Sequence, residues 1–441
     1  MTSQPPSPRA VPGANDPALR SFIEVQADSH FPIQNLPFGI FSLDENGPGA
    51  LRRAGVAIGD QVLDLRFLRD QGLLDAPPKL FDQPDLNAFL AAGRPVWRAV
   101  RERVSVLLRA DNPELRDHAM RERALHPIGS VKLHMPVLCS GFSDFMLSKE
   151  HARNCIDIVG GTNDGQFWPN WHHFPMGYNS RASSVVVSQT PVRRPWGQIK
   201  PRDEALPQLG VCQQLDFELE TALVVGKPNV LGRPISLHEV PEHAFGVVLL
   251  NDWSARDIQQ WEAQPLGVFN SKNFSTSISP WIVTLDALEP FRVDGPMQEP
   301  QPLAYLRHAG KGNIRAHMQA WIQPQDHNKP SVVCSSELGD LYWNFDQQLV
   351  HQTSAGCNVN PGDLLGSGTV SSSGSDSLAC LFEKTRDGRE RFNLEHGGQR
   401  LYLEDGDEVT LTGWCQGEGY RVGFGQCVGR VLPALEVFPQ G

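Results

Sequence analysis

Hydrophobic and polar positions alternate along the segment from Leu215 to Gly226, LDFELETALVVG. This period of two predicts a β-strand, because successive side chains of a strand point to opposite faces. The odd-numbered apolar residues at its start would point into a core, so Glu218 and Glu220 would share the other face. Two carboxylates on one face have the spacing of metal ligands, although a solvated strand face remains an open alternative.

A second segment, Gly246 to Trp261 (GVVLLNDWSARDIQQW), places an acid at the end of an apolar strand. Asp252 follows the apolar run, and Arg256 and Gln259 lie in the turn and helix behind it. An acid at a strand tip with a cation beside it suits a site that holds a metal and an anionic substrate together. A helix cap after a buried strand is the open alternative for Asp252.

The same patterns predict two domains and a fold that is mostly β with some α. Residues 31–65 alternate short apolar runs with Gly, Pro and Asn, which predicts a small β-barrel. Residues 86–90 and 96–108 carry apolar side chains at helical spacing. We place the domain boundary near Val131, with strands and short helices from there to residue 435.

Composition agrees with this division and excludes several classes of function. A length of 441 residues allows two well-packed domains, and 40 Gly with 35 Pro favour a turn-rich β chain. The net charge of −11 without a dense basic run argues against nucleic acid as a partner. The apolar runs fall far short of the roughly 20 residues that cross a bilayer, so no membrane span is expected.

The first residues are rich in proline and contain no apolar core of a secretory signal. We expect residues 1–20 to be a disordered lead, residues 21–130 to form the barrel domain with a helical extension, and residues 131–441 to form the catalytic domain. The eight cysteines contain no CxxC pair, which argues against a structural zinc site and a disulfide framework. This usage favours a reducing, cytoplasmic location.

The segment GFSDFMLSKEHARN opens the second domain, and its Ser143-Asp144 pair predicts a helix start. Asp144 and His151 are seven residues apart, so in one helix they would share a face, about 10 Å apart along the axis by the ~1.5 Å rise per residue. One could bind a metal while the other transfers protons. A helix cap and a surface histidine are the open alternative.

Asp144, Glu218, Glu220 and Asp252 together could form an all-oxygen site that suits Mg²⁺ or Ca²⁺ better than zinc. Lys272, in the loop GVFNSKNFSTSISPW, could place a cation in a pocket, although most loop lysines are solvated. The serine-rich stretch from Gly366 to Ser377 lacks the lysine of a phosphate-binding loop, so we interpret it as a hairpin turn.

Several runs of this chain resemble the fumarylacetoacetase family over about residues 30–435. They include PIQNLPFGIFS, RASSVVVS, LDFELE, NDWSARDIQQWE, PGDLLGSGT and GYRVGFGQC. The resemblance implies an N-terminal SH3-like barrel, a large mixed β-roll catalytic domain and a homodimer. It also implies hydrolysis of a carbon–carbon bond in a β-diketone. One candidate substrate is 4-fumarylacetoacetate, which would give fumarate and acetoacetate.

The resemblance assigns roles to particular residues. Asp144, Glu218, Glu220 and Asp252 match the metal ligands, and the bound ion would chelate both oxygens of the diketone. His151 matches the base that activates water, and Glu383 matches the carboxylate that orients it. Arg256, Gln259 and Lys272 match the groups that stabilise and protonate the departing carbanion, and Thr369 lines the same site. Tyr178, in MGYNSRASS, is retained from the group that binds the acidic arm of the substrate.

Three positions depart from the family pattern, and all three lie on the substrate side. Met146 and Ala263 stand where tyrosines are expected, and Gly160 stands where an arginine is expected. Losing these donors would replace a wall that holds a carboxylate with a wider, less polar one. Two alternatives to hydrolysis stay open: decarboxylation or tautomerisation of a keto acid, and a paralogue that binds metal without turnover.

Overall fold

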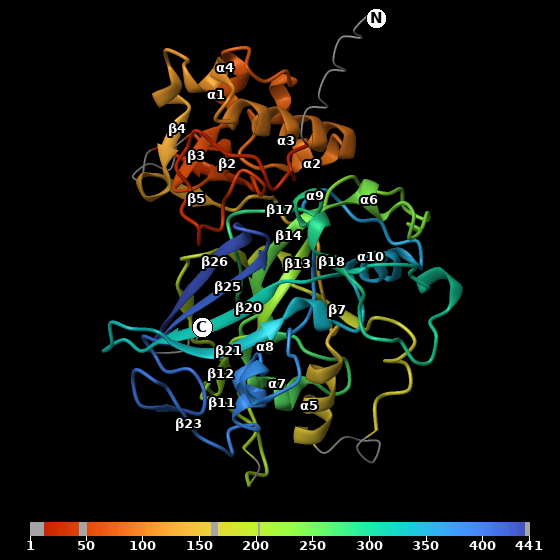
Figure 1. Ribbon diagram of the computed structural model, residues 1–441. Helices are drawn as coiled ribbons and strands as arrows, with labels where there is room; N and C mark the ends of the chain where they lie inside the picture. Colours follow the sequence, from red (N-terminus) through yellow and green to blue (C-terminus); the bar gives the residue numbers. More distant parts are fainter. Residues whose placement is uncertain (1–12, 44–50, 160–165, 202, 437–441) are drawn as a thin grey trace, which may run out of the picture.

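A five-stranded antiparallel sheet with the order β4-β3-β2-β1-β5 forms the N-terminal part of the computed structural model (Figure 1), which describes residues 13–43, 51–159, 166–201 and 203–436. Its strands are β1 (Phe38–Ser42), β2 (Arg53–Ile58), β3 (Gln61–Asp64), β4 (Leu125–Pro127) and β5 (Lys132–His134). The helices of this part are α1 (Leu65–Asp70), α2 (Asn87–Ala91), α3 (Arg94–Leu108) and α4 (Pro113–Arg116). The expected short strands and the two expected helices are confirmed.

Two expectations about the chain's organisation need correction. Residues 13–20 are not disordered: the Ala14 amide donates to Glu102 of α3 at 3.0 Å, and Leu19 is buried. A backbone hydrogen bond at Ala14 and the buried Leu19 side chain therefore hold a segment whose composition alone indicates disorder. Strand β5 lies beyond the expected boundary at Val131 yet pairs with β1, so the N-terminal sheet extends to His134. The rest of the domain division stays a prediction.

The larger part of the chain contains an eight-stranded mixed sheet with the order β7-β6-β22-β13-β14-β16-β8, in which β17 also pairs with β14. Two of the pairs, β6 with β22 and β16 with β8, are parallel. The strands are β6 (Phe142–Phe145), β7 (Gly177–Ser180), β8 (Val185–Val187), β13 (Leu219–Val225), β14 (Ala244–Asn251), β16 (Thr276–Ile278), β17 (Val283–Thr284) and β22 (Leu364–Gly366).

A second sheet, of order β21-β20-β25-β26-β9, packs against the first. It contains β9 (Val192–Arg193), β20 (His317–Gln323), β21 (Ser331–Glu337), β25 (Glu408–Gln416) and β26 (Arg421–Leu432). Shorter pairs are β10 (Trp196–Ile199) with β11 (Gln208–Val211), β12 (Leu215–Asp216) with β15 (Ser254–Ala255), β18 (Arg292–Val293) with β19 (Asn313–Ile314), and β23 (Phe392–Asn393) with β24 (Gln399–Arg400).

The helices of this larger part are α5 (Lys149–Val159), α6 (Val240–His243), α7 (Arg256–Glu262), α8 (Asn270–Asn273), α9 (Leu285–Leu288), α10 (Phe345–Thr353) and α11 (Leu381–Lys384). Most of them are short, so the fold is mostly β with some α, as expected. No helix of the described residues is long and apolar enough to cross a membrane.

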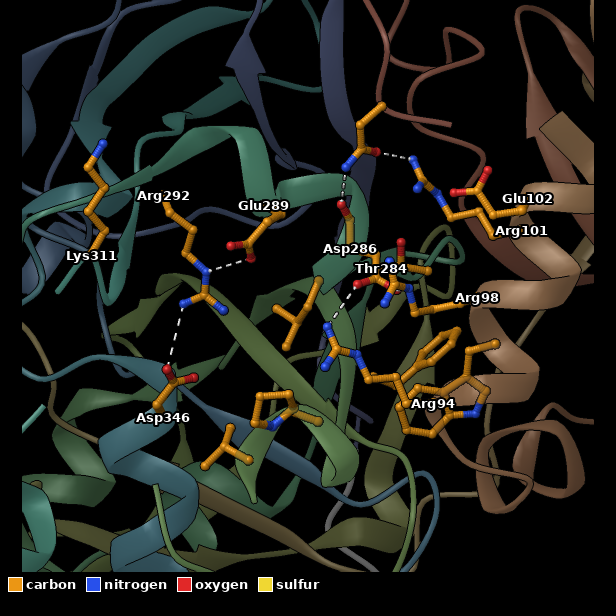
Figure 2. A pocket seen from close by; sticks show the side chains of 17 residues that line it. Arg94, Arg98, Arg101, Glu102, Thr284, Asp286, Glu289, Arg292, Lys311 and Asp346 are labelled. Atoms are coloured by element: carbon orange, nitrogen blue, oxygen red, sulfur yellow. Dashed lines mark hydrogen bonds and ion pairs between the residues drawn. The ribbon is translucent and has the colours of Figure 1, made fainter. Parts of the chain in front are cut away.

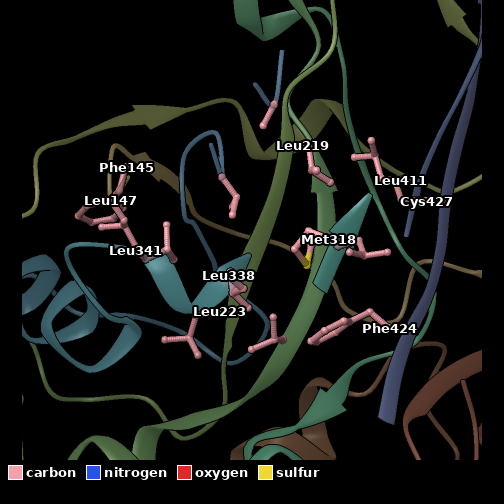
Figure 3. Close-up of a cluster of buried hydrophobic side chains, with 14 of the residues drawn as sticks. Phe145, Leu147, Leu219, Leu223, Met318, Leu338, Leu341, Leu411, Phe424 and Cys427 are labelled. Carbon is pink, nitrogen blue, oxygen red and sulfur yellow. The ribbon is translucent and has the colours of Figure 1, made fainter. Parts of the chain in front are cut away.

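The two central strands β13 and β14 are buried on both faces, and alternate side chains enter different cores. Leu223 and Leu249 pack with the second sheet in the cluster of Figure 3, which also contains Met318 and Phe424. Side chains on the opposite face of the same strands, such as Val248, pack with the helices and strands of the N-terminal part. The large sheet therefore packs on one face against the second sheet and on the other against the N-terminal part of the chain.

A cavity of about 400 Å³ lies where α3 meets α6 and α9 (Figure 2). Arg94 and Arg98 of α3 both pair with Asp286 of α9, at 3.3 and 3.5 Å. Farther along the cavity Arg292 faces Asp346 at 3.8 Å. Asp286 and Asp346 thus each lie close to at least one arginine. None of the candidate catalytic residues lines the cavity. It belongs to the contact between the two parts of the chain.

Candidate active site

Four buried carboxylates converge at one end of the large sheet. Asp144 lies in β6, Glu218 precedes β13, Glu220 lies in β13 and Asp252 follows β14, and each offers an oxygen within 4.8 Å of the others. The strand order brings them together, because β6 and β14 flank the β22-β13 pair. The expected convergence of Glu218 and Glu220 is therefore observed, and their role as metal ligands stays a prediction.

The segment that carries both glutamates is not the single strand that we expected. It breaks into β12 and β13 around Glu218, whose backbone forms an isolated bridge with Cys380. The break has a local cause: the Asp216 carboxylate accepts hydrogen bonds from the backbone amides of Phe217, Leu381 and Phe382, at 2.7 to 2.9 Å. These bonds divert the chain before β13 begins.

Asp144 does not begin a helix, which corrects a second expectation. It lies inside β6, paired with Tyr178 of β7 and Gly366 of β22, and its carboxylate accepts from the Gly368 amide at 3.2 Å. Helix α5 begins at Lys149, and the Ser148 hydroxyl accepts from the His151 amide at 3.0 Å. Pairing on both sides holds this short, buried segment as strand, so the helical spacing to His151 does not apply.

Two buried cations neutralise one side of the carboxylate cluster. Lys272 of α8 binds both Glu218 and Asp252, the latter at 2.8 Å, and Arg256 of α7 donates to Glu218 at 2.9 Å. Burial opposes ionisation of Glu218, but these two cations outweigh it and lower the pKa of Glu218 well below its ordinary value. Lys272 is therefore not a solvated loop lysine.

The other side of the cluster has no such compensation. Among the described residues, neither Asp144 nor Glu220 forms an ion pair, and both Glu220 oxygens are buried without a hydrogen-bond donor. Burial, followed by the neighbouring carboxylates, raises the pKa of Asp144 to about 7 and raises that of Glu220 well above its usual range. Orphaned, mutually repelling carboxylate oxygens fit a divalent cation that prefers oxygen ligands.

A glycine keeps space open beside these oxygens. A Cβ atom at Gly366 would collide with the carboxylate of Asp144 and would lie 3.3 Å from Oε2 of Glu220. Any larger residue would therefore displace both carboxylates. The serine-rich stretch that begins here is not the hairpin turn that we expected, because Ser367 to Ser372 run through the buried site.

His151 of α5 forms a buried pair with Glu383 of α11, with 3.0 Å between Nδ1 and Oε2. Glu383 also accepts from Ser371 and from Asn154, each at 2.7 Å. Burial disfavours the charged ring, but Cys155 and Glu383 outweigh it and raise the pKa of His151 well above its ordinary value. Burial likewise opposes ionisation of Glu383, yet His151 lowers its pKa. The result is an oriented and strongly basic imidazole.

Arg256 is held from behind by Asp216, at 2.8 Å, and reaches Gln259 one turn along α7 at 3.0 Å. Asp216 thus fixes both Arg256 and the start of α11, which carries Glu383. Our sequence reasoning did not single out Asp216 or Ser371. The signal for Asp216 is its position in LDFELE, one residue before the apolar Phe217, where a buried acid needs a partner.

Tyr178 and Thr369 lie beside the carboxylates, as the resemblance implies. The Tyr178 hydroxyl donates to Asp252 at 3.0 Å, and burial, with the nearby carboxylates, raises the pKa of this phenol well above its usual value. Thr369 is buried, and its hydroxyl has no partner among the described residues. That free hydroxyl is available to a ligand.

Two of the three positions that depart from the family pattern lie in the described part of the chain. Met146 is half-buried against the core, and its amide donates to Met176 at 2.9 Å. Ala263 caps the end of α7 and is also half-buried. Gly160 lies outside the described residues. A less polar substrate wall stays a prediction.

Four buried carboxylates that could hold a divalent cation lie with two buried cations and an imidazole–carboxylate pair, an arrangement that suits a metal-dependent hydrolase. The chain belongs to the fumarylacetoacetase family. Residues 142–432 match the family model "Fumarylacetoacetate (FAA) hydrolase C-terminal", and residues 34–136 match "Fumarylacetoacetase N-terminal". Both parts of the fold thus correspond to parts of the family.

Curated relatives match over nearly the whole chain. It is 47% identical to the fumarylacetoacetase of Oryza sativa subsp. japonica, over 96% of this chain and 99% of that protein. The fumarylacetoacetase of Mus musculus is 46% identical, over 94% and 99%. A solved fumarylacetoacetate hydrolase from Exiguobacterium antarcticum has a TM-score of 0.50 at 17% identity, over 90% and 99% of the two chains. That likeness supports the fold alone.

Proposed function

We propose that the protein hydrolyses 4-fumarylacetoacetate to fumarate and acetoacetate, which is a step in the degradation of tyrosine. The relatives that carry this activity in their names cover nearly all of the chain. The observation that carries the proposal is the buried His151–Glu383 pair beside the four carboxylates. The backbone of Glu218 forms an isolated bridge with Cys380, three residues before Glu383, so the base and the carboxylate cluster belong to one site.

His151 would act as the general base. Its Nδ1 atom faces Glu383, which favours the tautomer that leaves Nε2 free to take a proton. That proton comes from a water whose oxygen attacks a carbonyl carbon of the diketone. The carbon–carbon bond then breaks, the electron pair stays on the departing carbon as an enolate, and a proton delivered to that carbon completes the product.

Lys272, Arg256 and Gln259 would stabilise and protonate the departing enolate. The two cations are buried and held in place by Glu218, Asp216 and Asp252 before substrate arrives. Fixed positive charge in a water-poor site stabilises a developing anion without reorganisation, and one such donor is typically worth ~3 to 4 kcal/mol. The free Thr369 hydroxyl would bind a substrate oxygen.

A divalent cation at Asp144, Glu218, Glu220 and Asp252 would supply the positive charge to which the diketone oxygens bind. Mg²⁺ and Ca²⁺ are the ions that we propose, because all four donors are carboxylate oxygens. Binding would offset the repulsion between Asp144 and Glu220. Decarboxylation and tautomerisation need no activated water, so the oriented His151–Glu383 pair favours hydrolysis over both.

Replacing the base tests this function. His151→Ala should lower kcat by the ~10² to 10⁴ typical of general-base loss and leave KM for fumarylacetoacetate largely unchanged. The exposed His173 provides a matched control, and His173→Ala should retain full activity. A His151→Ala variant with wild-type kcat would reject His151 as the base.

Three further features are proposed. The family resemblance implies a homodimer, the eight cysteines without a CxxC pair favour a cytoplasmic location, and we propose a catalytic domain that begins after β5. Light scattering coupled to size exclusion tests the first, because it would give twice the 48.8 kDa mass of one chain. A monomer at micromolar concentration would reject it.

A further inference from the structure

The His151–Glu383 pair belongs to a second cluster of metal-binding side chains, separate in composition from the four carboxylates. His151, Cys380 and Glu383 are all buried, and each offers a ligand atom within 4.8 Å of the other two. The Cys380 thiol lies 3.2 Å from Oε2 of Glu383, and Nδ1 of His151 lies 3.0 Å from the same oxygen. The three residues thus bring an imidazole nitrogen, a thiol sulfur and a carboxylate oxygen close together.

These separations are close to those of a tetrahedral zinc site. Zinc binds His nitrogen at about 2.0–2.1 Å, carboxylate oxygen at about 2.0–2.2 Å and Cys sulfur at about 2.3 Å. At the tetrahedral angle, two such ligands are about 3.3 to 3.7 Å apart. The observed 3.0 and 3.2 Å need only small outward movements of the side chains. The cluster is therefore nearly preformed.

A second thiol lies on the same helix as His151, outside the three-residue cluster. The Cys155 thiol, one turn beyond His151 on α5, lies 3.5 Å from Nε2 and 3.9 Å from Nδ1 of the imidazole. Cys155 packs against the small apolar cluster that contains Ile158, Cys380 and Phe382. An apolar shell of this kind strengthens the binding of a cation to thiolates, because it excludes competing water.

Outer contacts would hold the ligands in place. Asn154 keeps the second oxygen of Glu383 at 2.7 Å, and Ser371 donates to the first. Burial raises the pKa of the Cys380 thiol, so zinc itself must displace that proton to solvent, as coordinating zinc does. A cavity of about 450 Å³, lined in part by Asn154, Ile158 and Glu383, gives access to the cluster.

We propose that His151, Cys380 and Glu383 form an inhibitory three-residue zinc site at the catalytic base. The consequence for activity rests on the proposed function, since bound zinc would occupy the imidazole nitrogen and the carboxylate that activate water. The two centres would select different ions: the carboxylate cluster takes Mg²⁺ or Ca²⁺, and the nitrogen–sulfur cluster takes zinc. Zinc inhibition would then persist at saturating Mg²⁺.

Cobalt(II) provides a readout of binding that does not depend on activity. In wild-type protein saturated with Mg²⁺, Co²⁺ should give a thiolate-to-cobalt charge-transfer band in the near ultraviolet, and one equivalent of Zn²⁺ should abolish it. Cys380→Ser should lose most of the band, whereas Cys357→Ser, at an exposed cysteine, should keep it. Cys380→Ala serves as a second variant, with circular dichroism as the check of folding.

The absence of the band in the wild type, or an equal band in both Cys380 variants, would overturn the zinc site. Inhibition is measured separately, with each rate normalised to the zinc-free rate of the same variant. Cys380→Ser should raise the half-inhibitory Zn²⁺ concentration at least about tenfold, since losing even an outer-shell partner costs about 10- to 100-fold in affinity. A band that appears without inhibition would keep the zinc site and reject His151 and Glu383 as the hydrolytic pair.

Discussion

The imidazole of His151 lies 3.0 Å from the carboxylate of Glu383, and both side chains are buried. This contact joins α5 to α11, two helices that are more than 200 residues apart in the sequence. Because the pair is buried and oriented before substrate binds, the base needs no rearrangement to act.

Glu383→Gln should therefore change both the rate and its pH dependence. The carboxylate raises the pKa of His151, so its removal lowers that pKa and moves the acidic limb of the kcat/KM profile to lower pH. The rate on the plateau should fall by ~10² to 10⁴, as is typical of general-base loss. A pH profile that moves to higher pH would contradict this account.

The double variant His151→Ala, Glu383→Gln provides the control. If the two residues act as a unit, its kcat should be little lower than that of the worse single variant. Multiplicative losses would show that they act independently.

Glu220→Gln should weaken the metal site without weakening the metal-free fold. The carboxyl group is buried and unpartnered with a raised pKa, so a neutral amide of the same shape removes repulsion rather than an ion pair. We expect the affinity for Mg²⁺ or Ca²⁺, measured by isothermal titration calorimetry, to fall at least about tenfold, because one of four charged ligands is lost. The melting temperature without metal should stay equal or rise.

The exposed Glu204 supplies the comparison for this variant. Glu204→Gln should bind metal as the wild type does. Unchanged metal affinity in Glu220→Gln would remove Glu220 from the ligand set.

The stability of the metal-free protein should fall as the pH rises from about 4 to above 7. Asp144 has a folded pKa of about 7 against an ordinary value of 3.8, so its contribution is fully present below the lower value and is lost as the carboxyl ionises in the fold. A divalent cation should offset this loss, so its addition should raise the melting temperature more at about pH 8 than at about pH 5. Scanning fluorimetry with and without chelator measures both. A metal-induced rise that is larger at the acidic pH would contradict the role of Asp144.

The substrate wall provides a prediction about specificity. Met146 and Ala263 stand where the family pattern has tyrosines, and a hydrogen bond to a substrate carboxylate is worth ~1.5 to 3 kcal/mol, or roughly 10- to 150-fold in specificity. The double variant Met146→Tyr, Ala263→Tyr should raise kcat/KM for fumarylacetoacetate relative to that for an uncharged aryl β-diketone. An unchanged ratio would mean that other residues hold the acidic arm.

The candidate residues of the site could be predicted from the sequence better than the secondary structure around them. LDFELE and NDWSARD pointed to Glu218, Glu220, Asp252 and Arg256, because the strand period places the two glutamates on one face and an acid ends an apolar strand. The strand around Asp144 was mistaken for a helix start, since Ser-Asp before charged residues is also the pattern of an N-cap. What decides between them is pairing with β7 and β22, which begin more than 30 and more than 200 residues away.

Other parts of the site depend on contacts that no local pattern contains. Asp216 joins three backbone amides and Arg256 only after the chain has folded, and Ser371 reaches Glu383 from a stretch whose composition is typical of a turn. The proximity of Cys380 to His151 likewise arises from the packing of α5 on α11, whereas Cys155 lies one turn from His151 on the same helix.

Product analysis with fumarylacetoacetate tests the central claim most directly. The protein, supplied with Mg²⁺, is incubated with this substrate while the ultraviolet absorbance of the diketone is followed, and the products are quantified by chromatography. The account predicts loss of absorbance with fumarate and acetoacetate in equal amounts, and loss of this turnover in His151→Ala. Carbon dioxide or an isomer of the substrate in place of fumarate, or no turnover by metal-saturated wild type, would contradict it.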